Sequence, residues 1–315
     1  MEIREAVVLC AGLGTRMLPI SERVPKPCIP FLNRPILHWI LDGLAANGVK
    51  RVFINLHHKG QQVVECAKAH PAGLELRFSQ EPEILGTAGA FWPMRGLFKG
   101  EAFFVVNGDI FCDLPLQALA ARLDQAPEAL AVLAVRQTPK GASYTPLESD
   151  SRGVLKEFGK GANHFTGVYV ARRELLGRLL GPGPKELVSD LLRPLLPSGL
   201  VRILRYDGIW LDLGTPRSFL GASLAALEEI SRSRLAAPKE SRLEYRDGFP
   251  VLRHERAWIS RDASLTGPAI FGEGVRVPER CQVGNSVLLP GTILEEGERL
   301  EKTIAYADLK VPAEM

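Results

Sequence analysis

The sequence has few cysteines, and none of them forms a pair with the spacing of a zinc site. Five cysteines are scattered over 315 residues, their number is odd, and no CxxC motif occurs. A structural zinc site and a disulfide framework are therefore both disfavoured. The opening residues 1–5 include three charges and lead into a strand pattern, so no secretory signal is expected. We predict a reduced, cytoplasmic protein.

Long hydrophobic runs and blocks of like charge are also absent. The most apolar stretches, such as Ala6–Cys10 and Ala129–Val135, have the length of strands. A membrane-spanning helix needs about 20 apolar residues. The 39 Lys+Arg residues are interspersed with 36 Asp+Glu residues, without a basic stripe that contains aromatic residues. Neither a membrane nor a nucleic acid is therefore an expected partner, while a net charge of +3 suits small anionic substrates.

Strand and helix patterns alternate through residues 1–230. Strands are expected at 6–10, 51–56, 74–79, 102–106 and 129–135, and helices at 35–47, 61–70, 87–98 and 116–123. This order predicts an α/β fold with a doubly wound, mostly parallel sheet covered on both faces. Ligands bind beyond the carboxyl ends of such strands, so the loops after Cys10, Ser79 and Val106 are the expected binding region.

The last part of the chain has a different period. Residues 231–250 are charged and poor in apolar residues, and we expect a linker or peripheral extension there. Small or apolar residues then stand at 257, 263, 269, 275, 281, 287 and 293, and a second series stands at 259, 265, 271, 277, 283 and 289. Such a six-residue repeat is typical of a parallel β-helix, whereas ordinary strand alternation does not require steps of six. We therefore expect a short left-handed β-helix over residues 251–315, with homo-oligomer formation through its open end.

The segment after the first strand has the residue types of a phosphate-binding loop. Gly12 and Gly14 allow backbone N–H groups to approach phosphate oxygens. Arg16 can contact a phosphate in a bidentate way, and Lys26 is a cation on a backbone stiffened by a proline on each side. A dinucleotide-binding loop and a P-loop would each need residues that this segment lacks.

Residues 12–16 (GLGTR) and 25–27 (PKP) together resemble the opening motif of the sugar-1-phosphate nucleotidyltransferases, also called nucleotide-sugar pyrophosphorylases. The resemblance covers the whole chain, including the hexapeptide-repeat tail that many members carry. It implies a Rossmann-like catalytic domain at 1–230, a linker at 231–250 and a β-helix domain at 251–315. It also implies an EC 2.7.7 type enzyme, with Arg16 and Lys26 as catalytic residues. The resemblance assigns four residues of this loop to nucleotide binding: Ala11, Gly12, Gly14 and Thr15.

Residues 80–90 (QEPEILGTAGA) look like the nucleobase loop of this family. In that resemblance Gln80 and the backbone of Gly86 and Thr87 read the base. A plain helix start with Thr87 as its N-cap is the alternative reading, and both can hold together.

Two aspartates are candidates for a magnesium site. Asp109 stands just past a buried strand, which is a suitable place for a Mg²⁺ ligand, although a turn aspartate would look the same. Residues 210–216 (WLDLGTP) resemble the family motif W-x-D-x-G-T-P. Its aspartate, here Asp212, is the second carboxylate on the metal, so the resemblance implies Mg²⁺ as cofactor.

Residues 165–170 (FTGVYV) resemble the sugar-contact strand of the family, in which Thr166 and Gly167 face the sugar. Glu157 matches an acid that hydrogen-bonds sugar hydroxyls, and a solvated strand end is its alternative reading. Two departures concern this pocket. Tyr144 is followed by threonine where many members have glycine, and the family's Glu-Lys-Pro run is missing, which leaves a phosphate contact by Lys160 open.

The resemblance implies transfer of a nucleotidyl group from an NTP to a sugar 1-phosphate, with release of pyrophosphate. The attacking phosphate oxygen is already an anion, so no general base is required. Mannose-1-phosphate guanylyltransferases are the most similar members, and uridylyltransferases for glucose-, N-acetylglucosamine- or N-acetylmuramate-1-phosphate are the alternative. A non-catalytic regulatory relative that binds nucleotide sugar is an alternative of another class. It would be expected to lack residues of the set Arg16, Lys26, Asp109 and Asp212, all of which are present.

Overall fold

The chain folds as two units, and each is assembled from separate stretches of sequence. The computed structural model describes residues 1–71, 73–113, 115–139 and 141–313. Unit 1 contains Met1–Leu13 and Leu37–Trp210, and unit 2 contains Gly14–Ile36 and Leu211–Met315. The predicted boundaries at 230 and 250 stay predictions, and residues 314 and 315 lie outside the described residues.

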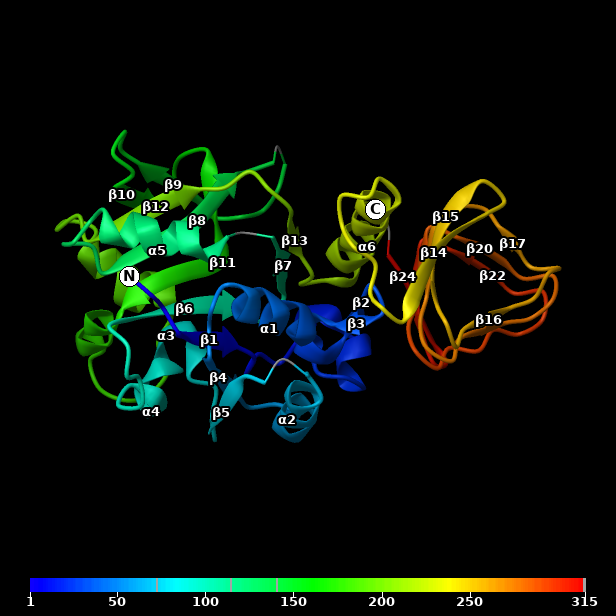
Figure 1. Ribbon diagram of the computed structural model, residues 1–315, viewed down its shortest axis with the longest axis horizontal. Coiled ribbons are helices and arrows are strands. Elements are labelled where there is room, and N and C mark those ends of the chain that lie inside the picture. The colour runs from blue at the N-terminus through cyan, green and yellow to red at the C-terminus, as the bar shows by residue number, and fades with distance from the viewer. Residues whose placement is uncertain (72, 114, 140, 314–315) are drawn as a thin grey trace. The chain divides into compact units, whose positions relative to one another are not determined.

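The elements of unit 1 follow the predicted alternation of strands and helices (Figure 1). They are β1 (Glu5–Leu9), α1 (Ile36–Ala46), β4 (Arg51–Leu56), α2 (Gly60–Lys68), β5 (Glu75–Gln80), α3 (Gly86–Gly89), α4 (Phe91–Met94), β6 (Ala102–Asn107), β7 (Ile110–Cys112), α5 (Leu116–Asp124), β8 (Ala131–Gln137), β9 (Pro146–Ser149), β10 (Leu155–Phe158), β11 (Asn163–Arg172), η4 (Arg173–Arg178), η5 (Leu187–Leu192), η6 (Arg193–Leu195) and β12 (Val201–Arg205). β13 (Trp210–Asp212) begins at the last residue of unit 1, and its other two residues belong to unit 2.

A nine-stranded sheet forms the centre of unit 1. Its main order is β10-β9-β11-β6-β1-β4-β5, and β8 joins β11 to β12. β1 pairs in parallel with β4 and β6, and β4 pairs in parallel with β5. β11 runs antiparallel to both β6 and β8. The α/β fold with a mostly parallel central sheet is therefore confirmed. The carboxyl ends of β1, β4, β5 and β6 lie along one edge of the sheet.

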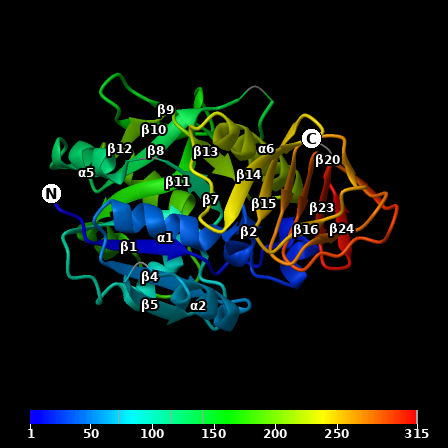
Figure 2. The same ribbon diagram turned by 45° about the vertical axis from the view of Figure 1, so that its right-hand side comes forward.

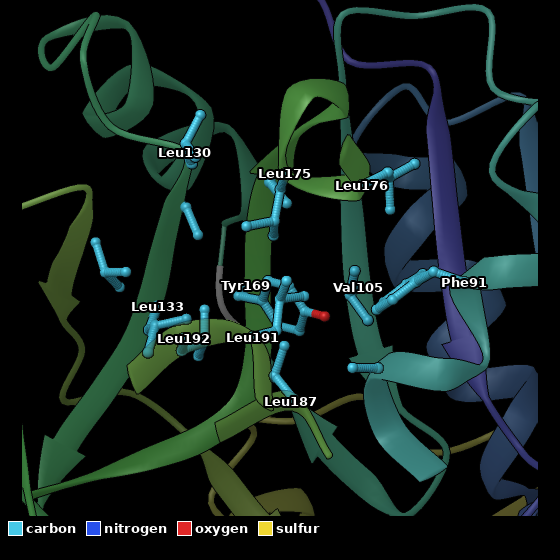
Figure 3. Packing of buried hydrophobic residues seen from close by; sticks show 14 of the residues in the cluster. Phe91, Val105, Leu130, Leu133, Tyr169, Leu175, Leu176, Leu187, Leu191 and Leu192 are labelled. Atoms are coloured by element: carbon cyan, nitrogen blue, oxygen red, sulfur yellow. The ribbon is translucent and has the colours of Figure 1, made fainter. Parts of the chain in front are cut away.

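Both faces of this sheet are buried. On one face Val105 and Tyr169 pack with Phe91 and Leu191, as Figure 3 shows. The residues that alternate with these along the strands are also fully buried, as Val8, Ile54 and Phe104 illustrate. Strands buried on both faces explain the continuous apolar runs in the sequence.

The prediction of one continuous helix over residues 87–98 is wrong. Two short helices, α3 and α4, occupy the region instead, and they meet at Ala90. Pro93 lies in α4 and has no N–H, so it cannot donate to the carbonyl of Gly89. The break therefore follows from proline chemistry that the apolar spacing does not show.

The elements of unit 2 combine short turns with many short strands (Figure 2). They are η1 (Thr15–Met17), η2 (Ile20–Glu22), η3 (Lys26–Cys28), β2 (Pro30–Phe31), β3 (Arg34–Pro35), α6 (Pro216–Ser231), β14 (Ser241–Arg246), β15 (Phe249–His254), β16 (Trp258–Ile259), β17 (Ser264–Leu265), β18 (Ala269–Phe271), β19 (Arg276–Val277), β20 (Gln282–Gly284), β21 (Ser286–Leu288), β22 (Arg299–Glu301), β23 (Thr303–Tyr306) and β24 (Leu309–Pro312).

The C-terminal strands pair mostly in parallel, in three sheets that the chain visits in turn. Trp258 pairs with Arg276, which stands three six-residue repeats further along the chain. Arg276 in turn bridges to Ile293, one residue short of three repeats. In the other two sheets the spacing between paired residues also falls one residue short of three repeats, at β21 and β22. The six-residue period is therefore regular over the first paired strands and loses one residue near Asn285.

The loss of one residue changes which side chains point inward. The predicted series pack in the core of these strands as far as Val283. Beyond it Leu288 and Leu294 occupy the core, and Ile293, which the series places inside, is 62% exposed. Asn285, between β20 and β21, has a φ of 47°, and this left-handed conformation makes the turn that is one residue shorter than the others. The step of six is thus wrong at 293, where the shifted register exposes the side chain, whereas Val287 and Leu289 of the predicted series are still buried.

Segment 231–250, expected as a linker, contains the end of α6 and β14, which pairs antiparallel with β15. α6 begins with a capping box in which Thr215 and Ser218 each accept a backbone hydrogen bond from the other. The helix packs against strands β15, β18, β21 and β23. In the described ranges, no helix is long and apolar enough to cross a membrane.

Candidate active site

The predicted phosphate loop begins in unit 1, at the carboxyl end of β1. The N–H of Cys10 donates to Oδ1 of Asn55 at 2.7 Å, which fixes the end of the strand. Ala11 is buried and Gly12 is exposed, and a Cβ built on Gly12 would meet nothing within 4 Å. Gly12 is therefore needed neither for close packing nor for a positive φ, which leaves approach of a ligand to its backbone as the predicted reason for glycine.

The rest of this loop lies in unit 2. Gly14 has a φ of 67°, and its carbonyl accepts hydrogen bonds from the hydroxyl of Ser21 at 2.8 Å and from the N–H of Met17 at 2.8 Å. Thr15 and Arg16 are exposed in the short helix η1. A Cβ on Gly14 would lie 3.7 Å from Cβ of Lys26. The predicted cation Lys26 therefore starts close to the glycine turn.

Unit 2 also brings Arg16 and Asp212 together. A Cβ built on Gly214 would lie 2.6 Å from Oδ1 of Asp212 and 3.2 Å from Nη2 of Arg16. The N–H of Gly214 donates to Oδ1 of Asp212 at 2.8 Å. The glycine in the G-T-P segment thus leaves room beside its backbone for both a carboxylate and a guanidinium.

Asp109 lies in unit 1, beyond the end of β6. The N–H of Gly108 donates to the carbonyl of Leu9 at 3.0 Å, so the two strand ends adjoin. Burial is the main cause that raises the pKa of the Cys10 thiol, and electrostatic contributions from Cys66 and Asp109 add to this effect. Asp109 is thus near the start of the phosphate loop.

Further along the same unit, the N–H of Asp113 donates to the carbonyl of Ile209 at 3.2 Å. The segment that follows Asp109 therefore lies beside the segment that precedes Asp212. Within the described residues, no group of three or more His, Cys, Asp or Glu side chains could hold a metal by itself.

A buried hydrogen-bond chain, which sequence reasoning missed, connects the phosphate loop to the base loop. Nδ2 of Asn55 donates to Oε1 of Glu81 at 2.8 Å, and Oε2 of Glu81 accepts from the N–H of Leu85 at 3.0 Å. Asn55 is 3% exposed and Glu81 is 1% exposed. In the sequence, these hydrogen bonds are signalled only by the polar residue Asn55 within an otherwise apolar strand run.

The predicted base loop packs against residues 183–187. Gly86 has a φ of 72°, and a Cβ on it would lie 2.6 Å from the carbonyl oxygen of Lys185. The hydroxyl of Thr87 donates to Oε2 of Glu186 at 2.7 Å and accepts from the N–H of Leu187 at 2.8 Å. The N-cap of α3 is Leu85 and Thr87 lies within the helix, so the alternative reading of Thr87 as an N-cap is wrong. Gln80 is the exposed last residue of β5.

The predicted sugar residues differ in their surroundings. A Cβ on Gly167 would lie 2.7 Å from Nδ2 of Asn107, so glycine lets β11 approach the end of β6. Thr166 is 2% exposed, and its hydroxyl donates to the carbonyl of Ala134 at 2.8 Å. Glu157 lies on β10, where Lys160 Nζ donates to its Oε2 at 3.1 Å. Gly167 therefore adjoins the Asp109 loop, and the Thr166 hydroxyl is occupied within the fold.

The structure thus distributes the predicted residues over the two units. Unit 1 holds Ala11, Gly12, Gln80, Gly86, Thr87, Asp109, Glu157, Thr166 and Gly167. Unit 2 holds Gly14, Thr15, Arg16, Lys26 and Asp212.

Comparison with known proteins places this arrangement in a family. Residues 5–229 match the family model described as "Nucleotidyl transferase". The chain is 28% identical over 240 residues to the mannose-1-phosphate guanylyltransferase catalytic subunit beta of Drosophila melanogaster, an alignment that covers 73% of this chain and 64% of that protein. It is 27% identical over 313 residues to the subunit of the same name from Danio rerio, with 95% of this chain and 85% of that protein covered.

A solved structure supports the same fold. HddC from Yersinia pseudotuberculosis superimposes with a TM-score of 0.62 at 21% identity, covering 71% of this chain and 100% of that chain. A second structure of HddC, in complex with GMP-PN, gives a TM-score of 0.61 at 21% identity over the same shares. The family model covers well over half of the sequence, and the fold agrees with it. This chain belongs to the nucleotidyl transferase family.

Proposed function

We propose that this protein transfers a nucleotidyl group from an NTP to a sugar 1-phosphate, giving an NDP-sugar and pyrophosphate. The observation that carries the proposal is the approach of Arg16 and Asp212 at Gly214, in the unit that also holds Lys26. A cation and a carboxylate side by side are what a reaction between phosphates needs, because one binds phosphate oxygens and the other binds a metal ion.

The chain's own groups act by positioning and by charge. The phosphate oxygen of the sugar 1-phosphate is the nucleophile, so no side chain has to remove a proton. Arg16 and Lys26 offset the repulsion between two polyanions, and the backbone at Gly12 and Gly14 contacts phosphate oxygens. No covalent intermediate with the protein is required.

The donor set suits Mg²⁺. Asp109 and Asp212 supply hard carboxylate oxygens, both residues are half-buried, and Gly214 keeps the space beside Asp212 open. Magnesium is usually held by one or two carboxylates together with substrate phosphates, so a third protein ligand is not needed. When bound, the ion would neutralise charge on the α-phosphate and the sugar phosphate.

Guanosine and mannose are the first substrates to test. The relatives from D. melanogaster and D. rerio are named mannose-1-phosphate guanylyltransferases, and the HddC structure contains GMP-PN. On this proposal Gln80 and the backbone of Gly86 and Thr87 bind the base. Glu157 and Gly167 bind the sugar, while Thr166, whose hydroxyl is bonded to the carbonyl of Ala134, positions the strand beside it.

For the C-terminal region we propose a left-handed parallel β-helix over residues 251–315, which follows in sequence a catalytic domain at 1–230. The strands pair in parallel in three sheets, and the paired residues are three six-residue repeats apart in sequence. Both observations support the β-helix. Trp258 pairs with Arg276, which bridges to Ile293, and Trp258 is 56% and Ile293 62% exposed. We propose that such apolar surface joins copies of the chain, which light scattering coupled to gel filtration tests.

Pyrophosphate release tests the catalytic proposal. The protein is mixed with Mg²⁺, each of the four common NTPs and a panel of sugar 1-phosphates, including mannose, glucose and N-acetylglucosamine 1-phosphate. Release that needs both one NTP and one sugar 1-phosphate supports the proposal, and the pair that reacts fastest identifies base and sugar. Nucleotide-sugar binding without release with any pair would instead indicate a regulatory protein.

A further inference from the structure

Unit 1 contains a pocket beside several of the predicted site residues. Its volume is about 440 Å³, within the range of pockets for small ligands. Phe158 and Phe165 line it, and each stands next in sequence to a residue of the predicted sugar site, Glu157 or Thr166. Thr87 of the base loop lines the pocket as well. The pocket is therefore bordered by the base loop and by the two strands that are predicted to contact the sugar.

Glu186 supplies a carboxylate to the wall of this pocket, and a ligand can reach it. The residue is exposed, and so is the hydrogen bond in which its Oε2 accepts from the hydroxyl of Thr87 at 2.7 Å. Among the described residues, the other carboxylate oxygen, Oε1, accepts no hydrogen bond. An ionised carboxylate has room for several donors, so Glu186 can accept from a ligand while it still binds Thr87.

Local backbone structure fixes the position of Glu186. It is the N-cap of η5, with an extended backbone at φ −95° and ψ 142°, and its N–H donates to Oδ2 of Asp190 at 2.6 Å. η5 is a π-helix, a rare element that often occurs at functional sites. A Cβ on Gly86 would lie 2.8 Å from Oε1 of Glu186, so glycine leaves room for the carboxylate. Glu186 is thus held by its backbone and by its side chain, and it loses little freedom when it binds a ligand.

The other groups that line the pocket suit a polyhydroxylated ring. Phe158 and Phe165 offer flat apolar surface, and Ser189, an exposed residue of η5, adds a hydroxyl. Arg193 also lines the pocket and donates to the carbonyl of Phe158 at 3.3 Å, and its guanidinium carbon lies 5.7 Å from the centroid of the Phe158 ring. The charges of Glu186 and Arg193 balance. A sugar ring has apolar faces for the aromatic rings and hydroxyls at its edge for the polar groups.

We propose that Glu186 accepts a hydrogen bond from a hydroxyl group of the sugar ring and thereby contributes to the choice of sugar. The inference rests on the proposed function and adds a residue that the predicted site lacks. Hydrogen bonds to a charged group are stronger than those between neutral groups, so a sugar without a hydroxyl at this place binds less well. Because the same carboxylate binds Thr87, the base loop and the sugar subsite share one side chain.

The test compares full-length wild type, Glu186→Ala and Glu186→Gln on the best sugar 1-phosphate and on each of its monodeoxy analogues. For wild type we expect one deoxy analogue to lose kcat/KM by about 10- to 100-fold, the effect of one hydrogen bond to a charged group. Glu186→Ala should lose a similar factor on the parent sugar and should then treat parent and that analogue alike. Glu186→Gln should retain part of the preference. Its Kd for the NTP in calorimetry should be unchanged, since the amide oxygen can still accept from Thr87.

Glu174, an exposed glutamate of η4, provides the matched control, and Glu174→Ala should leave every ratio unchanged. The inference is overturned if Glu186→Ala keeps the wild-type preference between the parent sugar and its deoxy analogues. An equal loss on every sugar also overturns it, because that pattern indicates a purely structural role.

A wild type that releases no pyrophosphate with any pair contradicts the proposed function instead. Calorimetry with the NDP-sugars of the same panel then compares wild type with Glu186→Ala. A variant that binds one NDP-sugar more weakly than wild type does, but binds its deoxy analogue equally well, would still support the contact. Equal affinities of the two proteins, or no binding by either, would reject it.

Discussion

At the residue scale, buried polar groups and small residues decide how the site is held. Asn55 and Glu81 connect the backbone at Cys10 to the backbone at Leu85, so one hydrogen-bond chain fixes both predicted nucleotide loops of unit 1. Neither residue binds substrate on the proposed function. They are positioning residues, and their effect should appear in nucleotide affinity and in stability together.

We expect Glu81→Gln to lower the free energy of unfolding by about 1–3 kcal/mol, since an amide cannot accept at both ends and leaves a buried group unpaired. The Kd for the NTP should rise as well, because the loop at Leu85 is no longer fixed. Chemical denaturation and calorimetry measure the two effects. Glu83→Gln, an exposed carboxylate in the same loop, should change neither value. Equal effects of the two variants would show that the hydrogen-bond chain has no positioning role.

Gly214 supplies a second prediction at this scale. Its φ is not in the left-handed region, so alanine introduces contacts without backbone strain. The added Cβ would press on Asp212 and Arg16, and a misplacement of about 1 Å can reduce turnover by about 100-fold. We expect Gly214→Ala to lose activity on that scale while its melting temperature stays close to that of wild type. Gly221→Ala, in α6 with nothing within 4 Å of its Cβ, should keep full activity. An active Gly214→Ala variant would remove the main support for the Arg16–Asp212 pair.

At the element scale, a short N-terminal segment belongs structurally with the end of the chain. Phe31 of β2 packs edge-on against Phe219 of α6, with ring centroids 6.2 Å apart, and both rings are fully buried. Nδ2 of Asn33 donates to the carbonyl of Phe271 at 3.0 Å, and Arg23 forms an ion pair with Asp308. The elements that carry Arg16 and Lys26 are thus stabilised by α6 and the C-terminal strands.

Phe31→Ala should therefore destabilise unit 2 by about 3–5 kcal/mol, the usual cost of removing a buried phenylalanine ring. Hydrogen exchange should show faster exchange in β15 and β18 as well as around Lys26, because these elements share one core. Leu18→Ala, at a residue 45% exposed in the same segment, should leave exchange unchanged. Faster exchange confined to residues 14–36 would contradict the shared core.

The elements of unit 1 were predictable where strands are buried on both faces. The runs at 51–56 and 102–106 give β4 and β6 almost to the residue, because continuous apolar residues fit only such strands. The split of the helix predicted at 87–98 depends on the missing N–H of a single residue, Pro93. The shift of period near Asn285 was hidden, because 287 and 288, and likewise 293 and 294, are both apolar. A pattern of apolar positions cannot distinguish two such registers.

At the scale of the whole molecule, the predicted site residues are distributed over two units, neither of which is continuous in sequence. The division between Leu13 and Gly14 separates the two glycines of one phosphate loop. Motif spacing pointed to the residue types, but the division follows from packing between segments about 200 residues apart, which local patterns do not record. Asn55, Glu81 and Glu186 escaped prediction for the same reason, since only the fold shows what they contact.

The measurement that tests the account most directly is the rate of pyrophosphate release by wild type, Asp109→Asn and Asp212→Asn. It uses saturating Mg²⁺ and the preferred pair of NTP and sugar 1-phosphate. We predict that each variant folds with wild-type circular dichroism and loses activity by about 100-fold or more, since asparagine keeps the shape but removes the charge that binds the ion. Near-normal turnover by either folded variant would contradict the claim that two carboxylates from distant parts of the chain bind the ion that joins the two phosphates.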